Sequence, residues 1–210
     1  MKRARILLAD DHALLLEAFE NLLEPEFEVV ATANDGRELL RKAAELKPDL
    51  IVLDISMPLL NGLDAGRQIK KILPTVKLVY LTMNQDLDLV TEALQMGANG
   101  YVLKNSAASE LREAIRRGLR GGTYVTPLIT RKMDGFLLQD PMRRKQVISL
   151  TPRQREVLQL LAEGRSMKEA AHILNLTPRT IAFHKYRMMD DFNIHSTAEL
   201  VKFAGRQQVA

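Results

Sequence analysis

The chain has 210 residues, of which 46% are hydrophobic, and a formal net charge of +4. This size allows one large or two small hydrophobic cores, and we expect two domains. The absence of cysteine excludes disulfides and thiolate metal sites. The apolar run after the basic N-terminus ends at Asp10, too soon for a signal peptide or a membrane span, so we expect a cytoplasmic protein that does not bind membranes.

Charge is distributed unevenly along the chain. Residues 1–120 carry 16 Lys and Arg against 18 Asp and Glu, whereas residues 121–210 carry 14 against 8. The net charges are therefore −2 and +6, and the basic second part is the candidate for a polyanion partner. The alternative is that this modest excess only keeps the domain soluble.

Apolar runs typical of buried parallel strands alternate with helical periodicity over the first 120 residues. Strands are expected at 6–9, 27–31, 50–53, 76–81 and 100–103, and helices at 14–23, 36–47, 62–73, 87–96 and 111–119. Five such units with right-handed crossovers predict an α/β, doubly wound, five-stranded parallel sheet.

Polar residues follow four of these strands. They are Asp10 and Asp11, Asp54, Thr82, and Lys104. Taken alone, Asp54 could cap the next turn and Thr82 could be a turn residue. Because the carboxyl ends of parallel strands meet at one edge of a sheet, we expect all five side chains to lie together.

The grouping of these residues predicts metal-assisted phosphoryl transfer. Clustered carboxylates favour Mg²⁺, which binds oxygen ligands, and a lysine with a hydroxyl suits the oxygens of a transferred phosphoryl group. Asp54 would be the nucleophile of that transfer.

Residues 1–122 resemble the receiver domain of bacterial two-component response regulators, which has a flavodoxin-like fold, in every one of these strand-end residues and in their order. The resemblance implies that a sensor histidine kinase phosphorylates Asp54, with Mg²⁺ held by Asp11, Asp54 and the Ser56 carbonyl. Asp10 would orient a metal-bound water, and Lys104 and Thr82 would hold the phosphoryl group.

The resemblance also implies a switch. Thr82 would move toward the phosphate while Tyr101 turns inward, which remodels the face made by the fourth helix, fifth strand and fifth helix. Ser56 and Asn84 would tune the loss of phosphate, so we expect a protein that can autodephosphorylate but is not a dedicated enzyme. Without the resemblance, Tyr101 is equally a strand packing residue.

Glycine and proline interrupt the pattern over 123–148, which we interpret as a linker with a short helix around 129–138. The basic run at 143–145 is either solvated surface or a phosphate contact. Residues 149–210 then predict four helices, whose starts carry Thr151 with Gln154, Ser166 with Glu169, Thr177 with Pro178, and Ser196 with Glu199.

The second and third of these helices, joined by a short turn, predict a helix-turn-helix. The segments at 150–153, 156–158, 161–164 and 176–181, with His184, resemble the LuxR-type DNA-binding domain, so the whole chain is similar to a NarL/FixJ-type response regulator. The resemblance implies a homodimer on activation that binds double-stranded DNA. The expected DNA contacts are Arg179, Thr180, Ala182, Phe183, His184, Lys185, Tyr186 and Arg187.

Several positions depart from the LuxR-type pattern. Ala182, Phe183 and Tyr186 stand where basic or polar residues are usual, and Asp190 and Asp191 lie near the expected phosphates, which predicts weak DNA binding or an unusual site. The two aromatic side chains would contact thymine methyl groups, face a partner protein or cover the core.

We interpret the chain as a phosphorylation-controlled transcription factor. Two alternatives remain open. One is a protein-interaction module whose output domain has lost DNA binding, and the other is an aspartyl-phosphate phosphatase, which would need a general acid where Ser56 stands.

Overall fold

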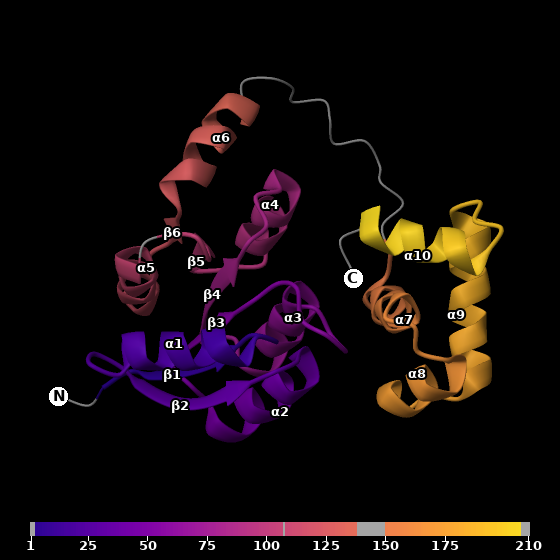
Figure 1. Ribbon diagram of the computed structural model, residues 1–210, viewed down its shortest axis with the longest axis horizontal. Coiled ribbons are helices and arrows are strands. Elements are labelled where there is room, and N and C mark those ends of the chain that lie inside the picture. The colour runs from indigo at the N-terminus through magenta and orange to yellow at the C-terminus, as the bar shows by residue number, and fades with distance from the viewer. Residues whose placement is uncertain (1–2, 107, 138–149, 207–210) are drawn as a thin grey trace. The chain divides into compact units, whose positions relative to one another are not determined.

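The computed structural model describes residues 3–106, 108–137 and 150–206, with the backbone alone for 134–137. These residues form two compact units, one built on a parallel sheet and one made of helices (Figure 1). The predicted linker residues 138–148, with the basic run at 143–145, lie outside the described residues. Among the helices described, none is long and apolar enough to cross a membrane.

The first unit contains a parallel sheet with the strand order β2-β1-β3-β4-β5-β6. The strands are β1 (Arg5–Ala9), β2 (Glu28–Ala33), β3 (Leu50–Leu53), β4 (Lys77–Thr82), β5 (Gly100–Leu103) and β6 (Tyr124–Val125). The predicted doubly wound sheet is confirmed, and the structure adds a sixth strand of two residues to the five expected.

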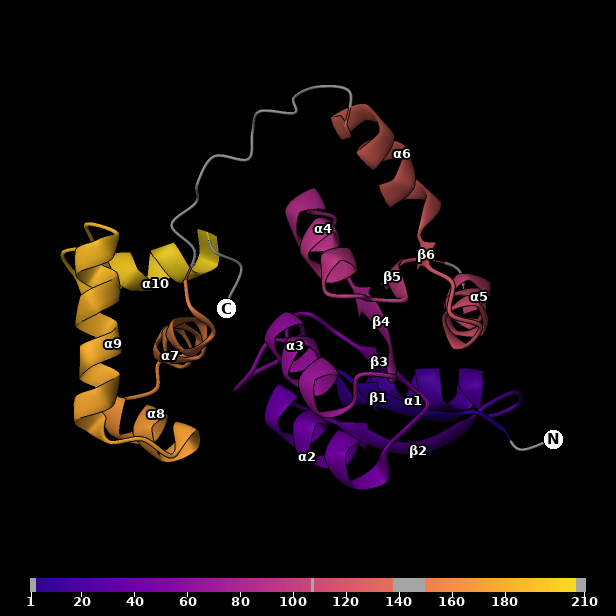
Figure 2. The ribbon, with the colours of Figure 1, turned by 180° about the vertical axis from the view of Figure 1, so that it is seen from behind.

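Helices cover both faces of the sheet. They are α1 (Ala13–Leu23), α2 (Gly36–Leu46), α3 (Gly62–Ile72), α4 (Leu87–Gln95) and α5 (Ala108–Leu119), while α6 (Pro127–Leu137) contacts α4. Apolar residues of α1 and α5, such as Leu16 and Ile115, pack against Val52 and Val79 in one core cluster. Helices α2 and α3 lie side by side in both views of the ribbon (Figures 1 and 2).

The register of the parallel strands aligns their carboxyl ends. Ala9 pairs with Leu53, and Leu53 pairs with Tyr80. In the same way Thr82 pairs with Leu103. The residues that follow these positions therefore leave the sheet at one edge, as the sequence predicts.

The sixth strand extends the sheet into the predicted linker. Gly121 has a φ of 83°, which lets the chain turn back after α5, and Tyr124 and Val125 then pair with β5. The Thr126 N–H donates to the Tyr101 carbonyl at 3.0 Å, and the Thr126 hydroxyl accepts from the Leu103 N–H at 3.2 Å. A strand of two residues is too short to show alternation, which is why sequence patterning missed it.

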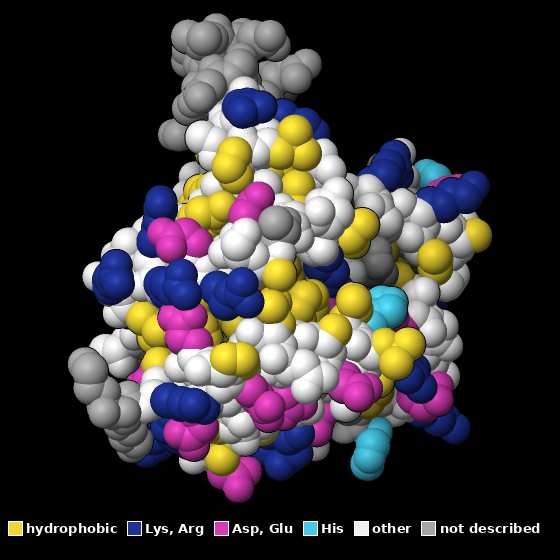
Figure 3. All heavy atoms as spheres, turned by 60° about the vertical axis from the view of Figure 1, so that its left-hand side comes forward, with side chains coloured by type: hydrophobic (Ala, Val, Ile, Leu, Met, Phe, Trp, Pro, Cys, Tyr) yellow, Lys and Arg dark blue, Asp and Glu magenta, His cyan; other side chains and the backbone are white. Residues whose placement is uncertain are grey.

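Charged side chains of both signs are interspersed on the face of the first unit seen in Figure 3. Within the first unit, ion pairs include the two-pronged contact of Arg116 with Glu26 and the helical pair Arg117–Glu113, all at 2.7 Å. This mixture agrees with the near-neutral charge of residues 1–120, and it gives this face no single-sign patch for a polyanion.

The second unit consists of four helices around one core. They are α7 (Pro152–Ala162), α8 (Met167–Leu174), α9 (Pro178–Asp191) and α10 (Thr197–Arg206). Leu158, Ile181, Met188 and Leu200 are fully buried where the helices meet. The predicted four-helix arrangement with a helix-turn-helix is confirmed.

Capping explains where these helices begin. The reciprocal boxes predicted for Thr151 with Gln154 and for Ser166 with Glu169 are both present. At α10 half of the predicted box is present, because the Ser196 hydroxyl accepts from the Glu199 N–H at 3.1 Å, while the Glu199 carboxylate accepts from the His195 N–H and not from that of Ser196. The turn between α8 and α9 uses Asn175 in the left-handed conformation, with a φ of 52°.

Candidate functional site

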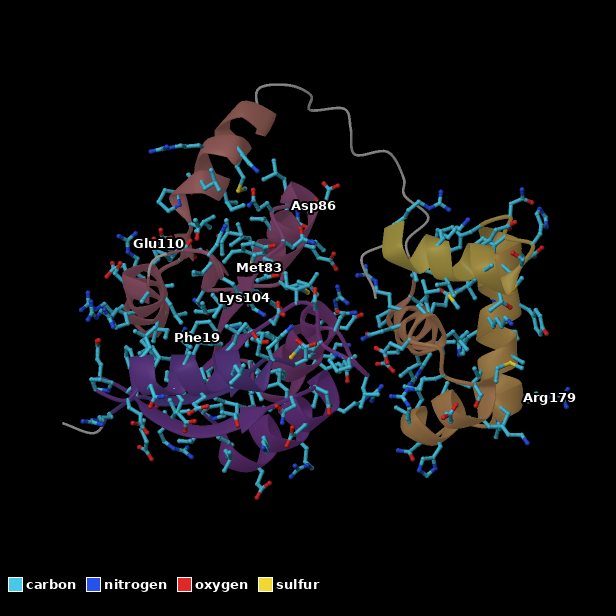
Figure 4. All side chains as sticks on the ribbon, in the orientation of Figure 1. Phe19, Met83, Asp86, Lys104, Glu110 and Arg179 are labelled. Carbon is cyan, nitrogen blue, oxygen red and sulfur yellow. The ribbon has the colours of Figure 1, made fainter. Side chains whose placement is uncertain are left out.

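Two buried carboxylates share one ammonium group at the carboxyl edge of the sheet. Asp54 follows β3 and is 4% exposed, while Asp10 follows β1 and is 2% exposed. The Lys104 Nζ lies 2.6 Å from Asp10 Oδ2 and 2.7 Å from Asp54 Oδ2. Figure 4 shows Lys104 next to the end of β5, so three strands that are distant in sequence build this contact.

The charge state of Lys104 follows from its surroundings. Burial lowers the pKa of Lys104, but hydrogen bonds and charge interactions with Asp10 and Asp54 outweigh it and leave the pKa above its ordinary value. The ammonium therefore stays protonated at neutral pH. The other Asp54 oxygen, Oδ1, accepts from the Ile55 N–H at 2.6 Å, which holds the carboxylate in place.

Asp11 and His12 extend this site toward solvent. Asp10, Asp11 and His12 each offer one ligand-type atom, and these atoms lie within 4.8 Å of one another. The His12 Nδ1 is 2.8 Å from Asp11 Oδ1 and 3.2 Å from Asp10 Oδ1. The charge of Asp11 and the hydrogen bonds that the imidazole gives to both carboxylates raise the pKa of His12.

The donors of this edge fit a hard divalent cation. Carboxylate oxygens are the ligands that Mg²⁺ prefers, and Asp11 brings one of them to the exposed side of buried Asp10. Ser56, the remaining predicted ligand, is exposed in the loop after Asp54. His12 was missed by sequence reasoning, although a histidine directly after two strand-end acids is the signal that could have found it.

Thr82 and Tyr101 are joined through Asn84. The buried Thr82 hydroxyl accepts from the Asn84 N–H at 3.2 Å, and the Tyr101 hydroxyl donates to the Asn84 carbonyl at 3.0 Å. The Tyr101 ring is fully buried, and this burial raises the pKa of its hydroxyl. Met83, which lies between Thr82 and Asn84 in the chain, is 64% exposed beside the site (Figure 4).

Gly62 is required for the loop that follows Asp54. The Gly62 N–H donates to the Ile55 carbonyl at 2.8 Å, and a Cβ on Gly62 would overlap the carbonyl oxygen of Asp54. We expect Gly62→Ala to lower the free energy of unfolding of the first unit by about 1–3 kcal/mol, because backbone atoms must move.

Scanning calorimetry of the full chain measures this effect on the transition of the first unit. Gly205→Ala in α10 is the matched control, since its Cβ would meet nothing within 4 Å. That change should raise the stability of the second unit by up to about 1 kcal/mol through helix propensity. A Gly62→Ala protein as stable as wild type would show that the loop has room to adjust.

The helix α9 of the second unit presents the predicted DNA contacts. Arg179, Phe183, Tyr186 and Arg187 are exposed, and Figure 4 shows Arg179 pointing away from the unit. The other four, Thr180, Ala182, His184 and Lys185, are partly buried. The alternative that Phe183 and Tyr186 cover the core is wrong, since the two side chains are 57% and 59% exposed.

Two of the predicted contacts also have partners within the unit. The Thr180 N–H donates to the Thr177 hydroxyl at 3.2 Å, so Thr180 belongs to the cap of α9. The Lys185 Nζ donates to the Thr197 hydroxyl at 3.0 Å and thereby ties α9 to α10. Both residues therefore contribute to the placement of the helix.

A cavity of about 340 Å³ separates the start of α7 from α9. It is lined by Thr151, Gln154, Phe183, His184, Arg187 and Asp191. Burial lowers the pKa of His184, with help from the positive charges of Arg153 and Arg187, so His184 is neutral at pH 7. The positive charge of this surface therefore comes from arginine and lysine.

The acidic end of α9 is partly compensated. Asp190 and Asp191 are both exposed, and the Arg187 Nε lies 3.8 Å from Asp191 Oδ2. This contact is longer than a hydrogen bond and solvent-exposed, so its contribution to stability is small. Arg187 nevertheless offsets part of the negative charge at this end of α9.

Comparison with known families supports this arrangement. Residues 6–116 match the response regulator receiver domain, and residues 148–204 match the bacterial regulatory proteins of the luxR family. The chain therefore belongs to the response regulators that join a receiver domain to a LuxR-type DNA-binding domain. The resemblance predicted from the sequence is confirmed.

Individual relatives lead to the same class. The chain is 34% identical to the oxygen regulatory protein NreC of Staphylococcus carnosus over 98% of both chains. It is 32% identical to the transcriptional regulatory protein DegU of Brevibacillus brevis, over 95% of this chain and 92% of that protein. Both are regulatory proteins by name, DegU of transcription, and the receiver and LuxR-type domains of this chain make it a transcription regulator as well.

Solved structures agree with these relatives. The RcsB response regulator of Salmonella typhimurium matches with a TM-score of 0.67 and 25% identity over 98% of both chains. An RcsB–DNA complex matches with a TM-score of 0.61 and 25% identity, over 97% of this chain and 98% of that chain. A LuxR-family response regulator from Aurantimonas matches with a TM-score of 0.63 and 34% identity, over 66% of this chain and all of that one.

Proposed function

We propose that this transcription regulator works in the cytoplasm by accepting a phosphoryl group on Asp54 from the phosphohistidine of a sensor histidine kinase. The observation that carries the proposal is the contact of Lys104 with both Asp10 and Asp54 in a buried edge of the sheet. Mg²⁺ would be held by Asp11, Asp54 and the Ser56 carbonyl. Its role would be to neutralise charge on the phosphoryl oxygens.

The residues of the chain would perform the transfer as follows. An Asp54 carboxylate oxygen attacks phosphorus, a P–O bond forms, and the P–N bond to the kinase histidine breaks. Lys104 donates a hydrogen bond to one phosphoryl oxygen, and the Thr82 hydroxyl donates a hydrogen bond to another. Asp10 would help to hold the Mg²⁺ by orienting one of its water ligands. Hydrolysis of the same acyl phosphate, influenced by Ser56 and Asn84, would reset the protein without a dedicated catalytic activity.

The switch would pass through Asn84. When the Thr82 hydroxyl turns to the phosphoryl group, its bond from the Asn84 N–H is given up, and the Asn84 carbonyl also holds the Tyr101 hydroxyl. Movement of Thr82 is thereby coupled to the loop before α4 and to β5. Phosphorylation would shift a pre-existing equilibrium between two arrangements of this face.

The output would be binding of double-stranded DNA by a homodimer. Helix α9 would enter the major groove, with two copies on successive segments of a repeat. The proposed domains are the receiver at 1–122, the linker at 123–148 and the DNA-binding domain at 149–210. The first part of that linker forms β6 and α6.

A protein-interaction module is the second candidate function. The exposed aromatic side chains of Phe183 and Tyr186 and the acidic end of α9 at Asp190 and Asp191 favour it. Gel mobility of random-sequence duplexes at low salt, with and without a phosphoryl analogue, separates the two. No binding under either condition would support the interaction module.

The molar mass in solution tests the main proposal. With Mg²⁺ and beryllium fluoride, we expect light scattering to record a doubling from 23.7 kDa for wild type and no change for Asp54→Ala. Without the analogue both proteins should be monomeric. A wild-type mass that does not respond, or a mutant that doubles like wild type, would contradict phosphorylation-controlled dimerisation through Asp54.

A further inference from the structure

We propose that Phe183 and Tyr186 determine which DNA this protein selects, by contacting the 5-methyl groups of thymine in the major groove. The inference rests on the proposed DNA-binding function and names the chemical feature that α9 would recognise. A thymine methyl is an apolar group on the base edge, so apolar side chains suit it.

The exposure of the two rings is the first observation. Phe183 is 57% exposed and Tyr186 is 59% exposed, more than any other large hydrophobic side chain described in the second unit. They are three residues apart on one helix, and therefore share a face, whereas Ile181 and Met188 face the core and are fully buried. The unit itself leaves this apolar face uncovered.

Charge around the rings is the second observation. The Arg187 guanidinium carbon lies 6.0 Å from the centre of the Phe183 ring, and the Lys185 Nζ lies 5.7 Å from the Tyr186 ring. Arg179 stands one helical turn before Phe183. An apolar strip bordered by cations complements a groove whose floor carries methyl groups and whose walls carry phosphates.

The few polar groups on this face are the third observation. Between Arg179 and Arg187, the exposed side chains of α9 are those of Phe183 and Tyr186, whereas those of Thr180, Ala182, His184 and Lys185 are partly buried. The Tyr186 hydroxyl is the one hydrogen-bonding group that the two rings offer. Discrimination by paired hydrogen bonds, as arginine or asparagine provides, is therefore replaced at this position by apolar contact.

Replacing thymine by uracil tests the inference, since it removes the methyl and leaves every hydrogen-bonding group and phosphate in place. A duplex would first be selected from a random pool with the full chain, Mg²⁺ and beryllium fluoride. Each thymine in turn is then replaced by uracil. We expect wild type to lose about three- to fivefold in affinity at one or more positions, with an unchanged dependence on salt.

Phe183→Gln and Tyr186→Gln are the informative variants. At least one of them should bind thymine and uracil duplexes equally, while Phe183→Leu keeps a preference for thymine because its side chain remains apolar. Ile72→Gln, at an exposed apolar position of α3, is the matched control and should discriminate as wild type does. Circular dichroism checks that each variant keeps its helices.

Each outcome decides a separate point. Equal binding of thymine and uracil duplexes by wild type, or full discrimination retained by both glutamine variants, would overturn the inference while leaving DNA binding intact. If wild type selects no duplex from the pool, the proposed DNA-binding function fails and the inference fails with it.

Discussion

Asp54→Asn should eliminate phosphorylation of the protein by a small-molecule phosphodonor such as acetyl phosphate. Wild type should incorporate about one phosphoryl group per chain and the variant none, because a neutral amide is not a nucleophile toward phosphorus. Intact-mass spectrometry in the presence of Mg²⁺ measures the incorporated group directly.

The opposite end of the same strand provides the control for this experiment. Asp49 is exposed just before β3, and its side chain accepts from the Arg5 N–H at 2.8 Å. Asp49→Asn should therefore be phosphorylated as wild type is. Incorporation into the Asp54→Asn protein at the wild-type level would place the acceptor elsewhere.

Lys104→Met should lower the free energy of unfolding of the first unit by about 3–5 kcal/mol at neutral pH, because it leaves two buried carboxylates without their cation. The side chains of Lys104, Asp10 and Asp54 are 6%, 3% and 5% exposed, so solvent replaces little of the lost interaction. Added Mg²⁺ should recover part of the loss by supplying positive charge at the same edge.

The pH of the measurement follows from the raised pKa of Lys104. A group whose pKa is higher in the folded chain contributes its full stabilisation below the ordinary value of 10.5 and loses it as the pH rises above that value. Neutral pH therefore captures the whole effect.

Chemical denaturation with and without Mg²⁺ is the readout. Lys71→Met, at an exposed position of α3, should change stability by less than about 0.5 kcal/mol. If Lys104→Met unfolds at the wild-type denaturant concentration, the buried contact does not stabilise the first unit.

The buried strands and their end residues were predictable because of the uniform apolar runs. The run of apolar residues that ends with Val52 and Leu53 indicates that β3 is buried on both faces of the sheet. The register that brings Asp10, Asp54 and Lys104 together follows from parallel pairing of the strands. What a linear pattern does not contain is the side-chain geometry. The bridging of two carboxylates by Lys104 and the position of His12 beside Asp11 depend on rotamers and on distances across the sheet.

In the second unit, too, local features were predictable from the sequence and tertiary contacts were not. Thr151 and Ser166 allowed the starts of α7 and α8 to be predicted, because a capping box is a local interaction between residues three apart. Burial along α9 was less predictable. Lys185 has the residue type of a DNA contact, but its hydrogen bond to Thr197 joins two helices, and the spacing along α9 does not reveal it.

The pairing of β6 with β5 also bears on how the receiver could be produced alone. A chain cut after residue 122 would expose the edge of β5, which carries Tyr101 and leads to Lys104, and an uncovered strand edge invites intermolecular pairing. It would also remove the Thr126 bonds to Tyr101 and Leu103. Expression of the receiver as a separate fragment should therefore extend through α6, so that the strand beside the phosphoacceptor keeps its natural neighbour.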